Sequence, residues 1–98
     1  MPAKYSHYRS KTDIVARILQ AANESNGITQ TKIMYRGFLS YVQLREYLVM
    51  LVENGLLEYF EGTRTYRTTE KGLKFLNMYE KMEELAPGTK LLEGQNNK

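Results

Sequence analysis

The segment spanning residues 40–72, SYVQLREYLVMLVENGLLEYFEGTRTYRTTEKG, changes its hydrophobic spacing twice. Residues 40–55 have apolar side chains at helical spacing, and one face carries Leu44, Tyr47, Leu48 and Leu51. The stretches Leu56–Phe60 and Arg64–Thr68 are instead typical of two paired strands. Thr69 then fits the cap of a further helix. The segment therefore predicts helix, strand, turn, strand and helix, in that order.

Capping and turn residues mark the ends of these elements. Ser40 and Gln43 form a capping-box pattern at the start of the first helix, and Asn54-Gly55 is a strong helix stop. Glu61-Gly62-Thr63 predicts the turn between the strands, with Gly62 supplying a positive φ angle. Gly72 weakens the last helix by roughly 1 kcal/mol relative to alanine, so we expect it to permit a close backbone approach.

A helix is also predicted upstream of this segment. It begins near Ser10, with Thr12 as an alternative cap and Asp13 in the first turn, where a carboxylate offsets the helix dipole. It ends within residues 23–27, NESNG. Its apolar face carries Ile14, Val15, Ile18, Leu19 and Ala22.

Short elements complete the predicted order. Ile28 fits a strand of one or two residues, and Thr29 fits the cap of a short helix that ends before Gly37. The last helix extends to about Leu85, because Ala86-Pro87-Gly88 forbids its continuation.

Composition limits the class of protein. Ninety-eight residues are enough for one domain, and the absence of cysteine excludes disulfides, thiolate zinc sites and cysteine nucleophiles. The longest apolar run, Tyr47–Val52, is too short to cross a bilayer, and residues 1–11 have no signal-peptide pattern. We therefore expect a soluble, cytoplasmic protein without contact to a membrane.

The positive charge is concentrated in the first half of the chain. Residues 1–45 hold seven basic and two acidic side chains, a net of +5, whereas residues 46–98 hold seven and nine, a net of −2. A basic front half favours a polyanionic partner. An ordinary soluble surface with uneven charge is the alternative that charge alone leaves open.

The chain resembles a family of small archaeal winged helix-turn-helix DNA-binding proteins, in which a winged helix is followed by a helix that pairs two chains. The similarity covers about residues 10–85 and is carried by Leu39-Ser40-Tyr41, Leu44, Tyr47-Leu48, Leu51, Asn54-Gly55-Leu56-Leu57 and Tyr66-Arg67-Thr68-Thr69-Glu70-Lys71-Gly72. It implies a mainly α member of the α+β class, with three helices, a two-stranded wing and a C-terminal helix. It also implies binding to double-stranded DNA, as a transcription regulator or as a chromosome-associated protein of the nucleoid.

The expected organisation has four parts. Residues 1–9 form a flexible N-terminal arm and residues 10–72 the winged-helix domain. Residues 73–86 form a C-terminal helix that dimerises, and residues 87–98 a polar tail.

The DNA-binding residues follow from this fold, because the third helix of a winged helix enters the major groove and the wing reaches the backbone or the minor groove. Gln43 and Arg45 are the expected readers of base edges, and Ser40 is placed to contact a phosphate. Other phosphates are assigned to Lys32, Arg36, Arg64, Arg67 and Lys71. The outward face of the third helix is expected to carry Val42, Gln43, Arg45, Glu46, Val49, Met50 and Glu53.

Two alternatives for that outward face remain open. It holds two acids and one base between Ser40 and Glu53, which also fits a solvated helix of mixed charge. Val49 and Met50 beside Glu46 would equally fit a winged helix that binds another protein and not DNA.

The last helix has two neighbouring apolar stripes. Phe75, Met78, Met82 and Leu85 are spaced as an a/d seam, and Leu73, Leu76 and Tyr79 lie beside them. One stripe is enough to dock the helix on its own domain. The second requires cover, which predicts a homodimer through Phe75, Met78, Tyr79, Met82 and Leu85.

Catalytic chemistry is not expected. His7 is the only histidine and lies in the N-terminal arm, and no glycine-rich phosphate loop follows a strand. Glu80, Glu83 and Glu84 lack a second group of ligands and fit a solvated face better than a metal site. We expect a protein that is not an enzyme and that uses no cofactor or metal.

Overall fold

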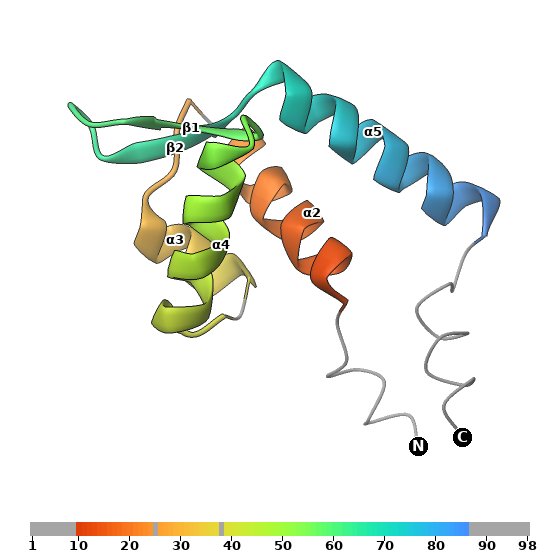
Figure 1. Ribbon diagram of the computed structural model, residues 1–98, viewed down its shortest axis with the longest axis horizontal. Coiled ribbons are helices and arrows are strands. Elements are labelled where there is room, and N and C mark those ends of the chain that lie inside the picture. The colour runs from red at the N-terminus through yellow and green to blue at the C-terminus, as the bar shows by residue number, and fades with distance from the viewer. Residues whose placement is uncertain (1–9, 25, 38, 87–98) are drawn as a thin grey trace.

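The computed structural model describes residues 10–24, 26–37 and 39–86 (Figure 1). These residues form four helices and one two-stranded sheet, in the order α2 Lys11–Asn23, α3 Gln30–Gly37, α4 Tyr41–Glu53, β1 Leu57–Phe60, β2 Thr65–Thr68 and α5 Glu70–Leu85. The predicted order of elements is confirmed. The expected boundary between residues 72 and 73 falls inside α5, and the expected arm and tail lie outside the described residues.

The helices begin at the capping residues that the sequence indicates. Ser10, not Thr12, caps α2: its hydroxyl accepts from the Asp13 amide at 3.1 Å, and its own amide donates to Asp13 Oδ2 at 3.2 Å. Ser40 and Gln43 form the same reciprocal pair at the start of α4. Such a cap contributes about 1 kcal/mol, because it satisfies amides that a helix terminus leaves unpaired. These starts are therefore determined locally.

The antiparallel hairpin of β1 and β2 differs from the prediction at its turn. Tyr59 pairs with Tyr66, and each strand is one residue shorter at its start than expected. The positive φ angle belongs to Arg64, at 56°, and not to Gly62, so that prediction is wrong. The single-residue strand at Ile28 is confirmed, because Ile28 and Tyr66 exchange backbone hydrogen bonds of 3.0 and 2.8 Å.

The hydrophobic core is centred on α2, which contacts α3, β2 and α5. Its largest fully buried side chains come from α2, α3, α4 and β1, and are Ile18, Leu19, Ile33, Leu44, Leu51 and Leu57. Each contributes roughly 1.5–3 kcal/mol by leaving water. The core therefore holds α4 by one face and leaves the opposite face of α4 to solvent.

Helix α5 starts against the end of α4. The Thr68 hydroxyl donates to the Leu19 carbonyl at 2.7 Å, and the Thr69 hydroxyl donates to the Gly55 carbonyl at 2.6 Å. A Cβ atom on Gly72 would lie only 2.4 Å from the Leu56 carbonyl oxygen. The close backbone approach predicted for Gly72 is confirmed.

The body of α5 docks on α2 and then projects away from α3 and α4 (Figure 1). Leu76 is buried, Phe75 and Tyr79 are half-buried against the core, and the Tyr79 hydroxyl donates to Asp13 Oδ1 at 2.7 Å. Burial raises the pKa of Tyr79 well above its ordinary value near 10, and the hydrogen bond to Asp13 raises it further. The two predicted apolar stripes of α5 therefore have different surroundings along their length. Phe75, Leu76 and Tyr79 pack on the domain core, whereas Met78 and Leu85 are exposed to solvent.

Gly72→Ala tests the close approach. Although alanine favours a helix by about 1 kcal/mol, the added methyl would collide with the Leu56 carbonyl and with Thr68 Cγ2. We expect a net loss of about 1–3 kcal/mol in the free energy of unfolding by urea. Gly62→Ala is the control, because a Cβ atom added there would meet nothing within 4 Å, and it should change stability by less than about 0.5 kcal/mol. A more stable Gly72→Ala variant would contradict the structure.

Tyr79→Phe tests the bond between α5 and α2. Loss of a hydrogen bond to a buried carboxylate should cost about 1–3 kcal/mol, whereas Tyr59→Phe should cost less than about 0.5 kcal/mol. Because the pKa of Tyr79 is raised in the folded state, its contribution is complete below pH 10 and is lost as the pH rises further. Urea unfolding at pH 8 and pH 10.5 should therefore show a smaller alkaline loss for Tyr79→Phe than for the native protein. Equal losses would show that Tyr79 does not keep its proton in the folded state.

Candidate nucleic-acid interface

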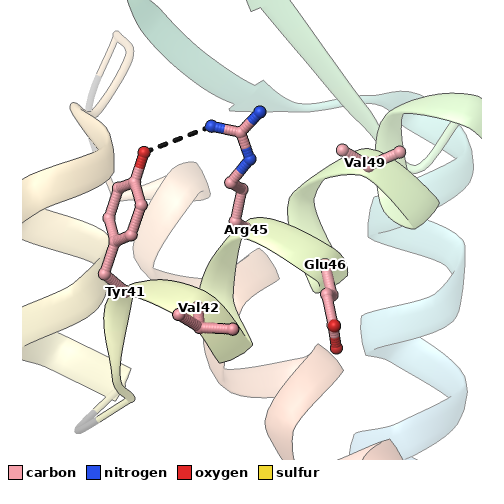
Figure 2. A pocket seen from close by; sticks show the side chains of 5 residues that line it. All are labelled: Tyr41, Val42, Arg45, Glu46 and Val49. Carbon is pink, nitrogen blue, oxygen red and sulfur yellow. Dashed lines mark hydrogen bonds between the residues drawn. The ribbon is translucent and has the colours of Figure 1, made fainter.

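The solvent-facing side of α4 is shaped by five residues. Tyr41, Val42, Arg45, Glu46 and Val49 line a shallow hollow of about 460 Å³ (Figure 2). Val42 is 66% exposed and Val49 52% exposed. All seven residues predicted to face outward from α4 are exposed, so the prediction of its two faces is confirmed.

Arg45 is held in place by a neighbour on the same helix. Its Nη1 donates to the Tyr41 hydroxyl at 3.2 Å, across one helical turn. Figure 2 shows both side chains projecting in the same direction from α4. The hydrogen bond uses one of the five guanidinium N–H groups and leaves the others available to a partner.

Two tyrosines of the hairpin pack against each other. The Tyr59 and Tyr66 rings are 4.7 Å apart between centroids. Burial raises the pKa of Tyr66, the Tyr59 and Tyr41 phenols raise it further, and the charge of Arg45 opposes them. The charge of Arg45 therefore reaches Tyr66 on the hairpin as well as Tyr41 on its own helix.

Gln43 is used by the helix cap. Its Oε1 accepts from the Ser40 amide at 3.3 Å and from the Ser40 hydroxyl at 3.2 Å. Bidentate recognition of adenine requires both the oxygen and the nitrogen of the amide. Gln43 must therefore leave the cap before it reads an adenine, and Ser40 is occupied in the same bonds.

The hairpin supplies two exposed cations. Arg64 lies at the turn in the left-handed conformation, which costs a side chain with Cβ about 1 kcal/mol more than glycine. Arg67 on β2 places its guanidinium 4.5 Å from the centroid of the Phe60 ring. Arg64 therefore occupies a backbone position where glycine would be less strained.

The remaining predicted phosphate contacts differ in their surroundings. Lys32 is exposed on α3, and Arg36 forms an ion pair with Glu24. Lys71 Nζ donates to the Asn54 carbonyl at 2.8 Å, at the C-terminal end of α4 and thus far along that helix from Ser40. Arg45 therefore lies on α4 and Arg64 and Arg67 lie on the hairpin, whereas Lys71 lies on α5 and contacts the C-terminal end of α4.

Sequence reasoning missed the role of aromatic residues at this site. Tyr41 stands four residues before Arg45, and this helical spacing was a usable signal for their contact. The electrostatic influence of Arg45 on Tyr66 had no such signal, because it depends on how the hairpin packs relative to α4.

Other kinds of site are not found in the part of the chain that the structure describes. Residues 10–24, 26–37 and 39–86 include no group of three histidine, cysteine, aspartate or glutamate side chains arranged to hold a metal ion. No described helix combines the length and the apolar character that a membrane span requires.

Comparisons with known proteins match this architecture. A family model described as winged helix-turn-helix matches residues 8–87. The chain belongs to the winged helix-turn-helix family. It is also similar to the crystal structure of Sso10a-2, a DNA-binding protein from Sulfolobus solfataricus, with a TM-score of 0.71 and 23% identity over 91% of this chain and 94% of that one. At this identity the likeness establishes a shared fold. A search of curated proteins found no match.

Membership in the family gives the elements their usual names. Helix α4 is the recognition helix and the β1–β2 hairpin is the wing. The hollow lies on the exposed face of the recognition helix.

Proposed function

We propose that this protein binds double-stranded DNA through its recognition helix and wing, without an enzymatic activity, as a transcription regulator or a chromosome-associated protein. One observation carries the proposal: Arg45 on the recognition helix and Arg64 and Arg67 on the wing are all exposed cations on the two elements that meet DNA in this fold. The resemblance in fold to a DNA-binding protein supports it. Association with the nucleoid would follow from the same activity.

The predicted phosphate-binding cations fall into two groups, according to whether each already binds another residue of the chain. Lys32, Arg64 and Arg67 have no carboxylate partner within ion-pair distance in the described residues, so they are the proposed phosphate contacts. Arg36 has to exchange Glu24 for a phosphate, and Lys71 has to leave the Asn54 carbonyl. We therefore expect Arg36 and Lys71 to contribute less, because each gives up an existing bond.

A salt titration tests the proposal. Fluorescence anisotropy with a random 30-base-pair duplex should show log affinity falling linearly with log salt, with a slope of about −0.9 for each phosphate contacted. Arg64→Gly should reduce that slope by about 1 while raising the unfolding free energy by about 1 kcal/mol, because glycine relieves the left-handed backbone.

The control for this variant is Lys81→Gln, which removes one positive charge from α5 and should leave the slope almost unchanged. Equal slopes for the native protein and Arg64→Gly would remove the wing tip from the interface. No binding at low salt would reject DNA as the partner and favour the protein-binding alternative, for which Val49 and Met50 are suitably exposed.

We also propose a homodimer through α5. Phe75 and Tyr79 already pack on their own core, so the surface that needs a partner is the adjoining exposed stripe of Met78, Met82 and Leu85. These three side chains lie within a narrow arc of the helix, at spacings of four and three residues. A second copy of α5 is the proposed cover.

Sedimentation velocity tests the dimer. Met78→Asp should shift a dimer to monomers at micromolar concentration, because a carboxylate cannot be buried against an apolar partner without a large cost. Far-ultraviolet circular dichroism should be unchanged, since Met78 is 72% exposed in one chain. Val42→Asp, a change at a similarly exposed position on α4, should leave the dimer intact. A native protein that sediments as a monomer would reject the dimer outright.

A further inference from the structure

A second hollow lies between the start of α2 and the middle of α4. Its volume is about 220 Å³, and its lining among the described residues consists of Lys11 from α2 and of Glu46, Tyr47 and Met50 from α4. Glu46 also lines the hollow beside Arg45, and Figure 2 shows it projecting away from that arginine. We call the second feature the α2–α4 hollow. It brings a cation, a carboxylate, a hydroxyl and a thioether to one concave surface.

The polar groups of the α2–α4 hollow are not bonded to one another. Lys11 and Glu46 carry opposite charges, yet no ion pair joins them, and neither is engaged by another of the described residues. The Tyr47 hydroxyl also makes no hydrogen bond within the described part of the chain, although its ring packs against the core. The hollow therefore presents a separated positive and negative charge that one ligand can pair at the same time.

We propose that the α2–α4 hollow binds a free α-amino acid with an apolar side chain. The ammonium group of the ligand pairs with Glu46, and its carboxylate pairs with Lys11. Its side chain lies against Met50 and the ring of Tyr47. The site is separate from the proposed DNA contacts of the wing and of α3, and it gives the protein a small-molecule effector.

The size and the charges of the hollow determine this class of ligand. Pockets for drug-sized ligands occupy about 300–1,000 Å³, so a hollow of about 220 Å³ suits a smaller molecule. An anion would bring its charge close to Glu46, and a cation would bring its charge close to Lys11. A zwitterion satisfies both residues and adds no net charge.

Met50 provides the apolar part of the site. Its side chain is 38% exposed, so part of its surface is open to a ligand. A methionine side chain is flexible and polarisable, and it packs against apolar groups of different shapes. The site should therefore accept several apolar amino acids and distinguish them less sharply than it distinguishes their charged ends.

Glu46 links the α2–α4 hollow to DNA binding. It stands on the recognition helix, where its carboxylate repels phosphates, and a bound ammonium group neutralises that charge. The ligand neutralises Lys11 as well, but Lys11 does not line the hollow beside Arg45. The change at the recognition helix therefore favours DNA. Amino acid and DNA should each raise the affinity of the protein for the other, and this coupling, unlike the site itself, rests on the proposed function.

Two-dimensional ¹H–¹⁵N NMR of the full chain with added L-leucine tests the site. The amide signals of Lys11, Glu46 and Met50 should shift saturably, with a dissociation constant on the order of 1 mM, because pairs between exposed charges are weak. N-acetyl-L-leucine lacks the ammonium group, and L-leucinamide lacks the carboxylate. Each should bind about fivefold more weakly than L-leucine.

Variants assign each end of the ligand to a residue. Glu46→Gln should weaken L-leucine binding about fivefold without weakening that of N-acetyl-L-leucine, which has no ammonium to lose. Lys11→Gln should weaken L-leucine binding similarly without weakening that of L-leucinamide. Glu53→Gln on α4 and Lys74→Gln on α5 remove the same charges outside the hollow, and both should bind L-leucine as the native protein does. All four positions are exposed, so the fold should be retained.

Fluorescence anisotropy with the random duplex tests the coupling. Saturating L-leucine should raise the affinity of the native protein for DNA about twofold or more at low salt. Glu46→Gln should bind the duplex more tightly than the native protein without leucine, and leucine should no longer change its affinity. Glu53→Gln should respond to leucine as the native protein does.

The outcomes separate this inference from the proposed function. Saturable leucine binding by a protein that binds no duplex would keep the site and reject DNA as the partner. DNA binding without any NMR shift at the highest soluble leucine concentration would keep the proposed function and overturn the site. Shifts that Glu46→Gln and Lys11→Gln leave unchanged would also overturn it. Leucine binding that leaves the affinity for DNA unchanged would overturn the coupling.

Discussion

The Leu56 carbonyl and Gly72 form the junction that orients the rest of this protein. Leu56 donates its amide to the Leu51 carbonyl at 2.9 Å, and its own carbonyl accepts from the Thr69 amide at 3.1 Å. Because Gly72 has no side chain, α5 begins directly against this peptide, and the Thr69 hydroxyl binds the neighbouring Gly55 carbonyl. The end of the recognition helix, the base of the wing and the start of α5 therefore share one set of backbone contacts. The wing and α5 are therefore both fixed to the C-terminal end of α4, the helix that carries Arg45.

Most of the fold could be predicted because its signals are local. The Ser10 and Ser40 caps depend on residues three positions away, and the apolar face of α4 repeats with the helical period. The prediction for the turn of the wing was wrong. The left-handed residue of this turn is Arg64 and not Gly62, because the loop geometry, and not the presence of a glycine, determines which position has a positive φ angle. The contact of Tyr79 with Asp13 joins residues 66 positions apart, and no local pattern indicated it.

The eight DNA-binding residues remain a prediction from the sequence, and the structure adds which other groups each of them already binds. All eight predicted DNA-binding side chains are exposed, yet exposure does not show which of them a ligand can use. Gln43 is committed to the cap, Arg36 to Glu24 and Lys71 to the end of α4. Each of these bonds is comparable in strength to a single phosphate contact at the surface, so binding through these residues exchanges one bond for another. Only the folded arrangement separates them from Arg45, Arg64 and Arg67.

The arrangement of charge has a consequence for how affinity and selectivity relate. In a site where the same arginines contact phosphates and bases, any change that raises affinity also raises binding to every sequence. Here the wing and α3 supply the cations, whereas the middle of α4 supplies apolar and hydrogen-bonding groups with no net charge. Salt screens the first contribution far more than the second, because base contacts release few counterions. Because the phosphate contacts are common to every sequence, raising the salt concentration should lower the affinity for all duplexes together and leave the ratio between any two of them nearly unchanged.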